Sequence, residues 1–107
     1  MLVNADKENY EQEILRSDLP VLVDFWGPQC QPCLALMPYV EALASERKES
    51  LKVAKVDASK NRRLCLNLKV LGLPTFLLYR NGEEVGRISG NNITPDSLIQ
   101  WIDKNTG

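Results

Sequence analysis

The chain has 107 residues, of which 44% are hydrophobic and 25% charged, and this composition excludes a disordered or collagen-like protein. Thirteen Lys and Arg residues stand against 14 Asp and Glu residues, so the net charge is −1 and no nucleic-acid partner is expected. The sequence contains no histidine, which excludes catalytic and metal sites that depend on imidazole. This length predicts a single domain over residues 1–107.

The chain also lacks the patterns of targeting and membrane segments. Its first residues show no basic stretch followed by an apolar run, so we expect no secretory signal peptide. No apolar segment approaches the roughly 18 residues that a membrane-spanning helix needs. We therefore expect a cytoplasmic protein without a membrane partner.

The first half of the chain alternates between helical and strand patterns. Residues 6–16 carry apolar side chains at helical spacing and predict a first helix. Residues 21–26 are almost continuously apolar, β-branched or aromatic, which predicts a strand covered on both faces, with Asp24 as the exception within it. Residues 30–48 return to helical spacing and predict a long helix, which we expect to kink at Pro38.

The second half continues the alternation and ends in a hairpin and a helix. The sequence predicts a strand at 51–57, a short helix at 60–69, strands at 75–80 and 84–88, and a last helix starting at Thr94 and Pro95. Asn81-Gly82 is typical of tight two-residue turns, so the strands on either side of it are expected to pair antiparallel. Leu2-Val3 suits a further short strand.

This order of elements predicts an α/β domain built on a mixed sheet. Strand–helix–strand alternation favours parallel strands joined by right-handed crossovers, and the closing hairpin adds an antiparallel pair. Reactive groups in such sheets gather at the carboxyl ends of the parallel strands. Since strand 21–26 leads directly towards Cys30, we expect the functional site there.

Cys30 and Cys33 are the strongest candidates for chemistry. Their spacing at the start of a helix puts both thiols on one face, within reach of a disulfide bond. The positive end of the helix dipole favours a thiolate at Cys30, with a pKa in the range of roughly 3.5–7.5. Geometry then predicts that Cys30 attacks a partner disulfide and that the more shielded Cys33 resolves the mixed disulfide.

The sequence around this pair resembles the thioredoxin family. The resemblance rests on Phe25-Trp26, the motif Cys30-Gln31-Pro32-Cys33, Pro38, Gly72-Leu73-Pro74-Thr75, Asn81-Gly82 and Gly90, in that order over nearly the full length. It implies a thioredoxin fold, with a central mixed sheet of four to five strands flanked by about four helices. The implied activity is reduction of protein disulfides without a bound cofactor.

The resemblance also implies roles for individual residues. Pro74 is expected to follow a cis peptide bond, and Leu73 to offer its backbone to an extended substrate strand. Together with Trp26 and Gly90, these two residues are expected to form a flat apolar rim where partner proteins dock. The implied partners are disulfide-containing protein substrates and a thioredoxin reductase. The protein itself is expected to be a monomer.

Asp24 matches the family's buried carboxylate, and Lys55 matches its partner lysine. From the residues alone, a carboxylate in an apolar strand is desolvated, so its pKa rises and it can exchange a proton with Cys33 near neutral pH. Lys55 nearby opposes part of that rise. The alternatives are a hydrogen-bonded carboxylate at a strand end for Asp24 and a solvated charge for Lys55.

Other features leave alternatives open. Gln29, Gln31 and Leu34 stand where the family usually has Trp, Gly and a basic residue, which predicts a different choice of partners and redox potential. Cys65 is interpreted as a small buried hydrophobic residue. For the whole protein, the alternatives are a redox-inert or metal-holding binding module, and a disulfide oxidant or isomerase outside the cytoplasm. With three cysteines in all and no histidine, we expect no metal site.

Overall fold

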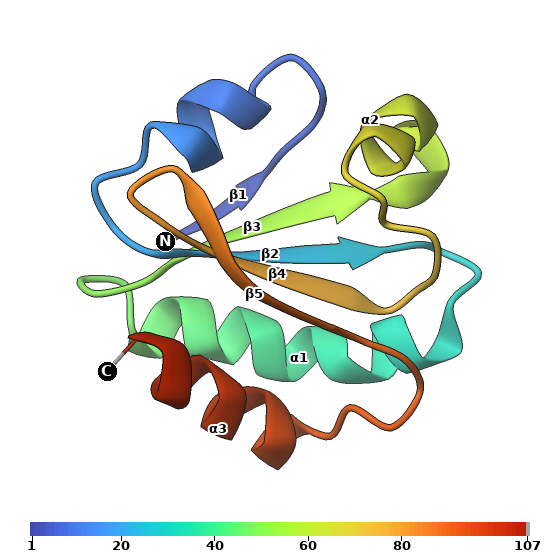
Figure 1. Cartoon of the computed structure of the whole chain (residues 1–107). Coiled ribbons are helices and arrows are strands. Elements are labelled where there is room, and N and C mark those ends of the chain that lie inside the picture. Colours follow the sequence, from blue (N-terminus) through green and yellow to red (C-terminus); the bar gives the residue numbers. More distant parts are fainter. Residues whose placement is uncertain (107) are drawn as a thin grey trace.

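A five-stranded sheet lies between two layers of helical segments (Figure 1). The computed structural model describes residues 1–106. Its elements are β1 (Leu2–Asn4), η1 (Glu11–Leu15), β2 (Val21–Trp26), α1 (Gln31–Glu46), β3 (Lys52–Asp57), η2 (Ala58–Lys60), α2 (Arg62–Asn67), β4 (Thr75–Arg80), β5 (Glu83–Ser89) and α3 (Pro95–Thr106). The predicted α/β architecture with a mixed sheet is therefore confirmed, including the short strand at the start of the chain.

The strands lie in the order β1-β3-β2-β4-β5. The first three are parallel, whereas β4 runs antiparallel to β2, and β5 antiparallel to β4. The rule that a helix between strands makes them parallel thus holds for β2-α1-β3 but not for β3-α2-β4. The six-residue helix α2 spans about 9 Å. It stays at the carboxyl end of β3 (Figure 1), so β4 starts at the end where β3 stops.

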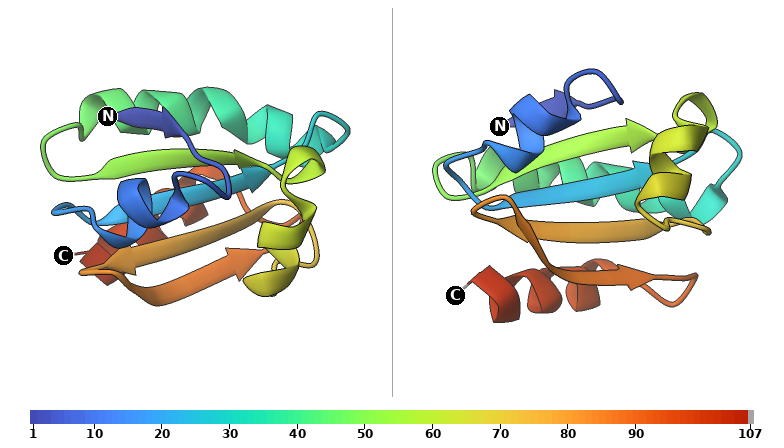
Figure 2. Two further views of the ribbon diagram at one scale, coloured as in Figure 1. Left: turned by 90° about the horizontal axis from the view of Figure 1, so that it is seen from above. Right: turned by 45° about the horizontal axis from the view of Figure 1, so that its top comes forward.

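Two apolar clusters hold the layers together, one on each face of the sheet. Figure 2 shows α1 and α3 on one face, with η1 and α2 on the other. The α1 and α3 face buries Leu22, Leu36, Val40, Leu43, Ala44, Leu51, Val53, Phe76, Leu78, Leu98 and Ile102. The opposite face buries Ala5, Tyr10, Ile14, Val21, Val23, Phe25, Ala54, Val56, Cys65, Val70, Leu77 and Tyr79. Burial of both faces explains why β2 is almost continuously apolar.

Two predicted helices are shorter than the apolar spacing indicates. The segment 6–16 is helical only over Glu11–Leu15. Asp6 Oδ1 accepts hydrogen bonds from the backbone N–H groups of Glu8 and Asn9, over 2.8 and 3.1 Å. These side-chain bonds replace the first helical turn, as short polar residues often do. The second helix, predicted over 60–69, covers Arg62–Asn67.

Two further local predictions concern Pro38 and the turn at residues 81–82. Helix α1 continues unbroken through Pro38, and the kink there stays a prediction. Asn81 and Gly82 have φ angles of 53° and 80°, as a two-residue turn between twisted strands requires. None of the helices within residues 1–106 has the length and apolar character needed to cross a membrane.

Candidate redox site

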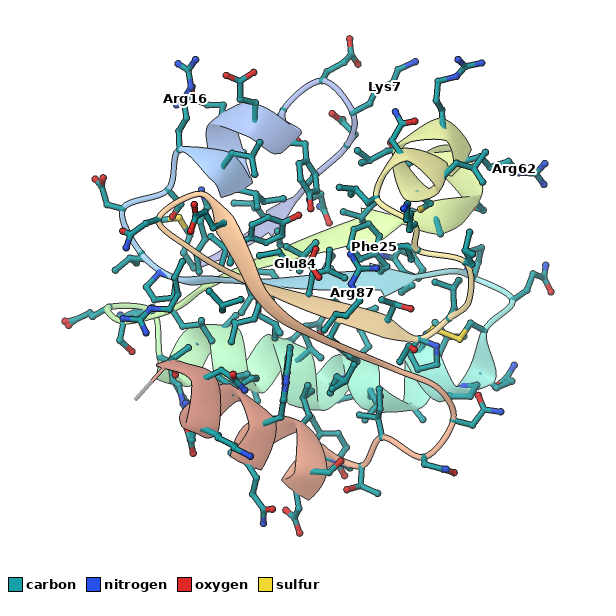
Figure 3. The ribbon with its side chains drawn as sticks, viewed as in Figure 1. Lys7, Arg16, Phe25, Arg62, Glu84 and Arg87 are labelled. Carbon is teal, nitrogen blue, oxygen red and sulfur yellow. A yellow bond between two sulfur atoms is a disulfide. The ribbon has the colours of Figure 1, made fainter. Side chains whose placement is uncertain are left out.

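Cys30 and Cys33 lie where β2 gives way to α1, and a disulfide joins them. Figure 3 shows the yellow sulfur–sulfur bond at the beginning of α1. Cys30 caps the helix, and its Sγ accepts a hydrogen bond from the backbone N–H of Cys33 over 3.2 Å. Pro32 occupies the first turn, where its missing N–H removes no helical bond. The sequence thus folds so that a helix amide points at the first sulfur.

The two sulfurs differ in their access to solvent. Cys33 is 2% exposed, whereas Cys30 is only partly buried. The Cα atoms are 5.2 Å apart, so the pair bridges within one helical turn. This difference in burial agrees with the sequence-based expectation that Cys33 is the more shielded of the two.

A shallow hollow of about 350 Å³ opens beside Cys30. Its lining residues are Gly27, Pro28, Gln29, Cys30, Ala58, Ser59 and Leu73. An added Cβ at Gly27 would lie 3.2 Å from Leu73 Cδ1, so this glycine permits the close approach of the two loops. The structure therefore brings Leu73, which lies far along the chain, next to the first cysteine.

The loop that carries Leu73 contains the expected cis peptide bond, between Leu73 and Pro74. Pro74 is buried, and its carbonyl oxygen accepts a hydrogen bond from the backbone N–H of Gly90 over 3.1 Å. Thr75 pairs with Phe25 in the register of β2 and β4. Because β4 is antiparallel to β2, its first residues lie at the carboxyl end of β2, where the cysteines follow.

Asp24 is 1% exposed, and its Oδ2 is buried without a hydrogen-bond partner among the described residues. The interpretation of this carboxyl as a fully hydrogen-bonded group at a strand end is therefore wrong. Burial raises the pKa of Asp24 to about 7, against the opposing positive charge of Lys55. Alternation along β2 puts Asp24 on the same sheet face as Leu22, which is the face that α1 covers.

Lys55 is the register partner of Asp24 on β3. Its side chain is only 15% exposed, so the interpretation as a freely solvated charge is wrong. The ammonium donates a hydrogen bond to Glu41 Oε2 over 3.2 Å, and no ion pair joins it to Asp24 within residues 1–106. Sequence reasoning missed Glu41, because nothing local indicates which residue of a 16-residue helix meets a given strand.

Trp26 is not among the residues that line the hollow beside Cys30. It is half-buried and lines a separate hollow of about 440 Å³. The other lining residues are Asn4, Ala5, Asp6, Lys7, Glu8, Lys55, Asp57, Lys60 and Asn61. Of the predicted docking rim, the structure thus brings Leu73 to Cys30 and joins Pro74 to Gly90, while Trp26 faces a different depression.

Cys65 is unpaired and 7% exposed, which confirms its predicted burial. Burial also raises the pKa of its thiol. Over the described residues 1–106, no three or more His, Cys, Asp or Glu side chains gather as metal ligands would.

The sequence is similar to the thioredoxin family model over residues 1–104. A thioredoxin from Rickettsia bellii is 36% identical over 105 residues, covering 98% of this chain and 99% of the relative. One from Peptoclostridium acidaminophilum is 37% identical over 107 residues, covering 100% and 97%, and one from Porphyra purpurea is 38% identical over 92 residues, covering 86% and 84%. The chain therefore belongs to the thioredoxin family, and its Cys30–Cys33 pair makes it a dithiol–disulfide oxidoreductase that reduces protein disulfides.

Proposed function

We propose that Cys30 is the attacking thiolate and Cys33 the resolving thiol of this reaction. The Cys30 thiolate attacks one sulfur of a substrate disulfide, forms a mixed disulfide and releases the other substrate sulfur as a thiolate. The Cys33 thiolate then attacks Cys30 Sγ, which releases the second substrate sulfur. The substrate gains two electrons, and the protein is left with the Cys30–Cys33 disulfide.

The observation that carries these roles is the hydrogen bond from the Cys33 N–H to Cys30 Sγ. An amide at a helix start stabilises negative charge on sulfur, so Cys30 is the better thiolate. Cys30 is also the more exposed sulfur of the two, which suits attack on a partner protein.

Asp24 serves as the proton acceptor and donor for Cys33 in this proposal. Its raised pKa, about 7, lets the carboxyl gain and lose a proton near neutral pH. Asp24 lies on the sheet face that α1 covers, and Cys33 is a buried residue of α1. A buried carboxyl oxygen without a hydrogen-bond partner among the described residues is a strong proton acceptor. Lys55 moderates the pKa of Asp24 through its positive charge.

The substrate docks on a surface made of Trp26, Leu73, Pro74 and Gly90. Leu73 lines the hollow beside Cys30, and Gly90 is exposed next to the Pro74 carbonyl. Since the Pro74 side chain is buried, this residue contributes by shaping the backbone. A backbone edge at Leu73 suits an extended substrate segment, which adds as a further strand.

The physiological partners follow from this chemistry. The oxidised protein needs a two-electron donor, which we propose is a thioredoxin reductase, and it works in the cytoplasm as a monomer without a bound cofactor. The substrates are proteins with accessible disulfides.

Trapping experiments test the roles of the two cysteines. Cys33→Ser is expected to accumulate mixed disulfides through Cys30, because the resolving thiol is gone. Cys30→Ser is expected to trap little, since Cys33 is 2% exposed. Equal trapping by the two variants, measured on non-reducing gels, would overturn the assignment.

Redox titration tests the direction of the reaction. A reductant should have a Cys30–Cys33 potential of about −270 mV, which is typical of thioredoxins, while a value above about −150 mV would indicate an oxidant. A reduced protein that binds zinc and leaves insulin disulfides intact would instead indicate a metal-holding module.

A further inference from the structure

Glu41 forms an ion pair that crosses from α1 to the sheet. Its Oε2 lies 3.2 Å from Lys55 Nζ. The Glu41 side chain is 49% exposed, whereas that of Lys55 is 15% exposed. The pair therefore joins the outer surface of the helix to a largely covered lysine on β3.

Lys55 has a second carboxylate within its neighbourhood. Asp24 is its register partner on the adjacent parallel strand, and neighbouring strands lie about 4.8 Å apart. Both side chains lie on the face that α1 covers, and the four-carbon stem of a lysine can turn towards either acid. Over the described residues 1–106, the buried Oδ2 of Asp24 has no hydrogen-bond partner, and the ammonium donates to Glu41 instead.

We propose that Glu41 is a positioning residue that holds the Lys55 ammonium away from Asp24 and so keeps Asp24 competent to exchange a proton with Cys33. This inference rests on the proton-transfer role proposed above for Asp24. Glu41 touches neither sulfur nor substrate in this proposal, and it acts only through Lys55.

The charges around Asp24 determine in which direction its pKa changes when Glu41 loses its charge. Lys55 faces it from β3, while its partner on β4 is the uncharged Phe76. Asp57, two residues beyond Lys55 on β3, lines the same hollow as Lys55. On α1, Cys33 is buried and Glu41 contacts Lys55. Loss of the Glu41 charge frees the ammonium to approach Asp24, and a cation in direct contact typically lowers a carboxyl pKa by about 1 unit or more.

The test is a pH titration of Asp24 in the Glu41→Gln variant. NMR of the Asp24 carboxyl carbon monitors the titration in both the oxidised and the reduced protein. The substitution keeps the size of the side chain and removes its charge at an exposed position. We expect the pKa of Asp24 to fall by about 1 unit. Glu46→Gln is the matched control, because Glu46 is exposed on the same helix and makes no ion pair within residues 1–106. It should leave the titration unchanged.

A double variant separates positioning from a simple through-space effect of the Glu41 charge. In a Lys55→Met background, Glu41→Gln should leave the pKa of Asp24 unchanged, because there is no ammonium to release. The same fall in both backgrounds would overturn the proposal, as would an unchanged pKa in the single variant. Glu41→Asp, which retains the charge, should restore the titration of the original protein.

Activity measurements distinguish this inference from the proposed function. If Glu41→Gln lowers the pKa of Asp24, the pH profile of insulin reduction should shift to lower pH by the same amount. A shifted pKa with an unshifted profile would leave the positioning role standing and remove Asp24 from the reaction. An unshifted pKa in Glu41→Gln, with slowed turnover in Asp24→Asn, would remove the positioning role alone.

Discussion

Arg87 and Glu84 form a two-pronged ion pair on β5, with Nε and Nη2 of the guanidinium 2.6 and 2.7 Å from the two carboxylate oxygens (Figure 3). The same guanidinium donates hydrogen bonds to the carbonyl oxygens of Leu68 and Lys69, over 3.1 and 3.2 Å. These carbonyls lie just after α2, which ends at Asn67, and begin the segment that leads to Pro74. Arg87 on β5 therefore anchors the start of the segment between α2 and β4, and the hydrogen bond from the Gly90 N–H to the Pro74 carbonyl anchors its end.

Arg87→Ala is expected to loosen this segment and to lower the free energy of unfolding by about 1–2 kcal/mol. The magnitude is that of charged hydrogen bonds to backbone carbonyls, reduced because the side chain is partly exposed. Urea unfolding measures the loss, and amide exchange should quicken at residues 70–73. Arg80→Ala removes an exposed arginine from the neighbouring strand and is the control. Equal effects of the two variants would contradict the anchoring role.

Asp24 is expected to make the protein less stable as the pH rises. Its pKa is about 7 in the folded chain against 3.8 for a free aspartate, so the folded state binds the proton more tightly. The contribution of Asp24 to the free energy of unfolding is therefore full below about pH 4 and falls as the pH rises to about 7, by on the order of 4 kcal/mol. The difference between the original protein and Asp24→Asn isolates this term. Parallel stability curves over that pH range would refute the buried, proton-binding carboxyl.

Tyr10 and Tyr79 share one buried hydrogen bond. The Tyr10 hydroxyl donates to the Tyr79 hydroxyl over 2.8 Å, and the rings meet edge to face. Tyr79→Phe leaves the Tyr10 hydroxyl buried without an acceptor, which should cost about 1–3 kcal/mol in thermal or urea unfolding. The double Phe variant should cost less than the sum of the two single variants, because both polar groups are then gone. Strict additivity would mean that the bond contributes nothing.

Gly82 and Gly72 form a matched pair for testing the hairpin turn. Gly82 has a φ of 80°, and an added Cβ would lie 2.8 Å from the Leu15 carbonyl oxygen, so Gly82→Ala should lower stability by about 1–3 kcal/mol. Gly72 has no atom within 4 Å of an added Cβ, so Gly72→Ala should change stability by less than about 1 kcal/mol. Urea titration of both variants compares them. Similar losses would show that the turn tolerates a side chain.

Much of the site was predictable because its parts are close in sequence. The Cys30 and Cys33 sulfurs meet through one helical turn, and the Asn81-Gly82 turn depends on the φ angles of two residues. The apolar run in β2 likewise indicates a covered strand, whatever packs on it. Pro74 was assigned from its family resemblance, and the structure has its peptide bond cis.

Contacts between distant residues were decided only by the tertiary structure. Whether Lys55 pairs with Asp24 or Glu41 depends on how α1 crosses β3. The direction of β4 depends on the end of the sheet at which α2 finishes. The turn that shortens the helix at 6–16 arises from side-chain bonds that compete with helical ones. Local patterns set the conformation of a segment through its own backbone. The neighbours of a side chain are set by tertiary packing, which brings together residues whose contact no local sequence pattern indicates.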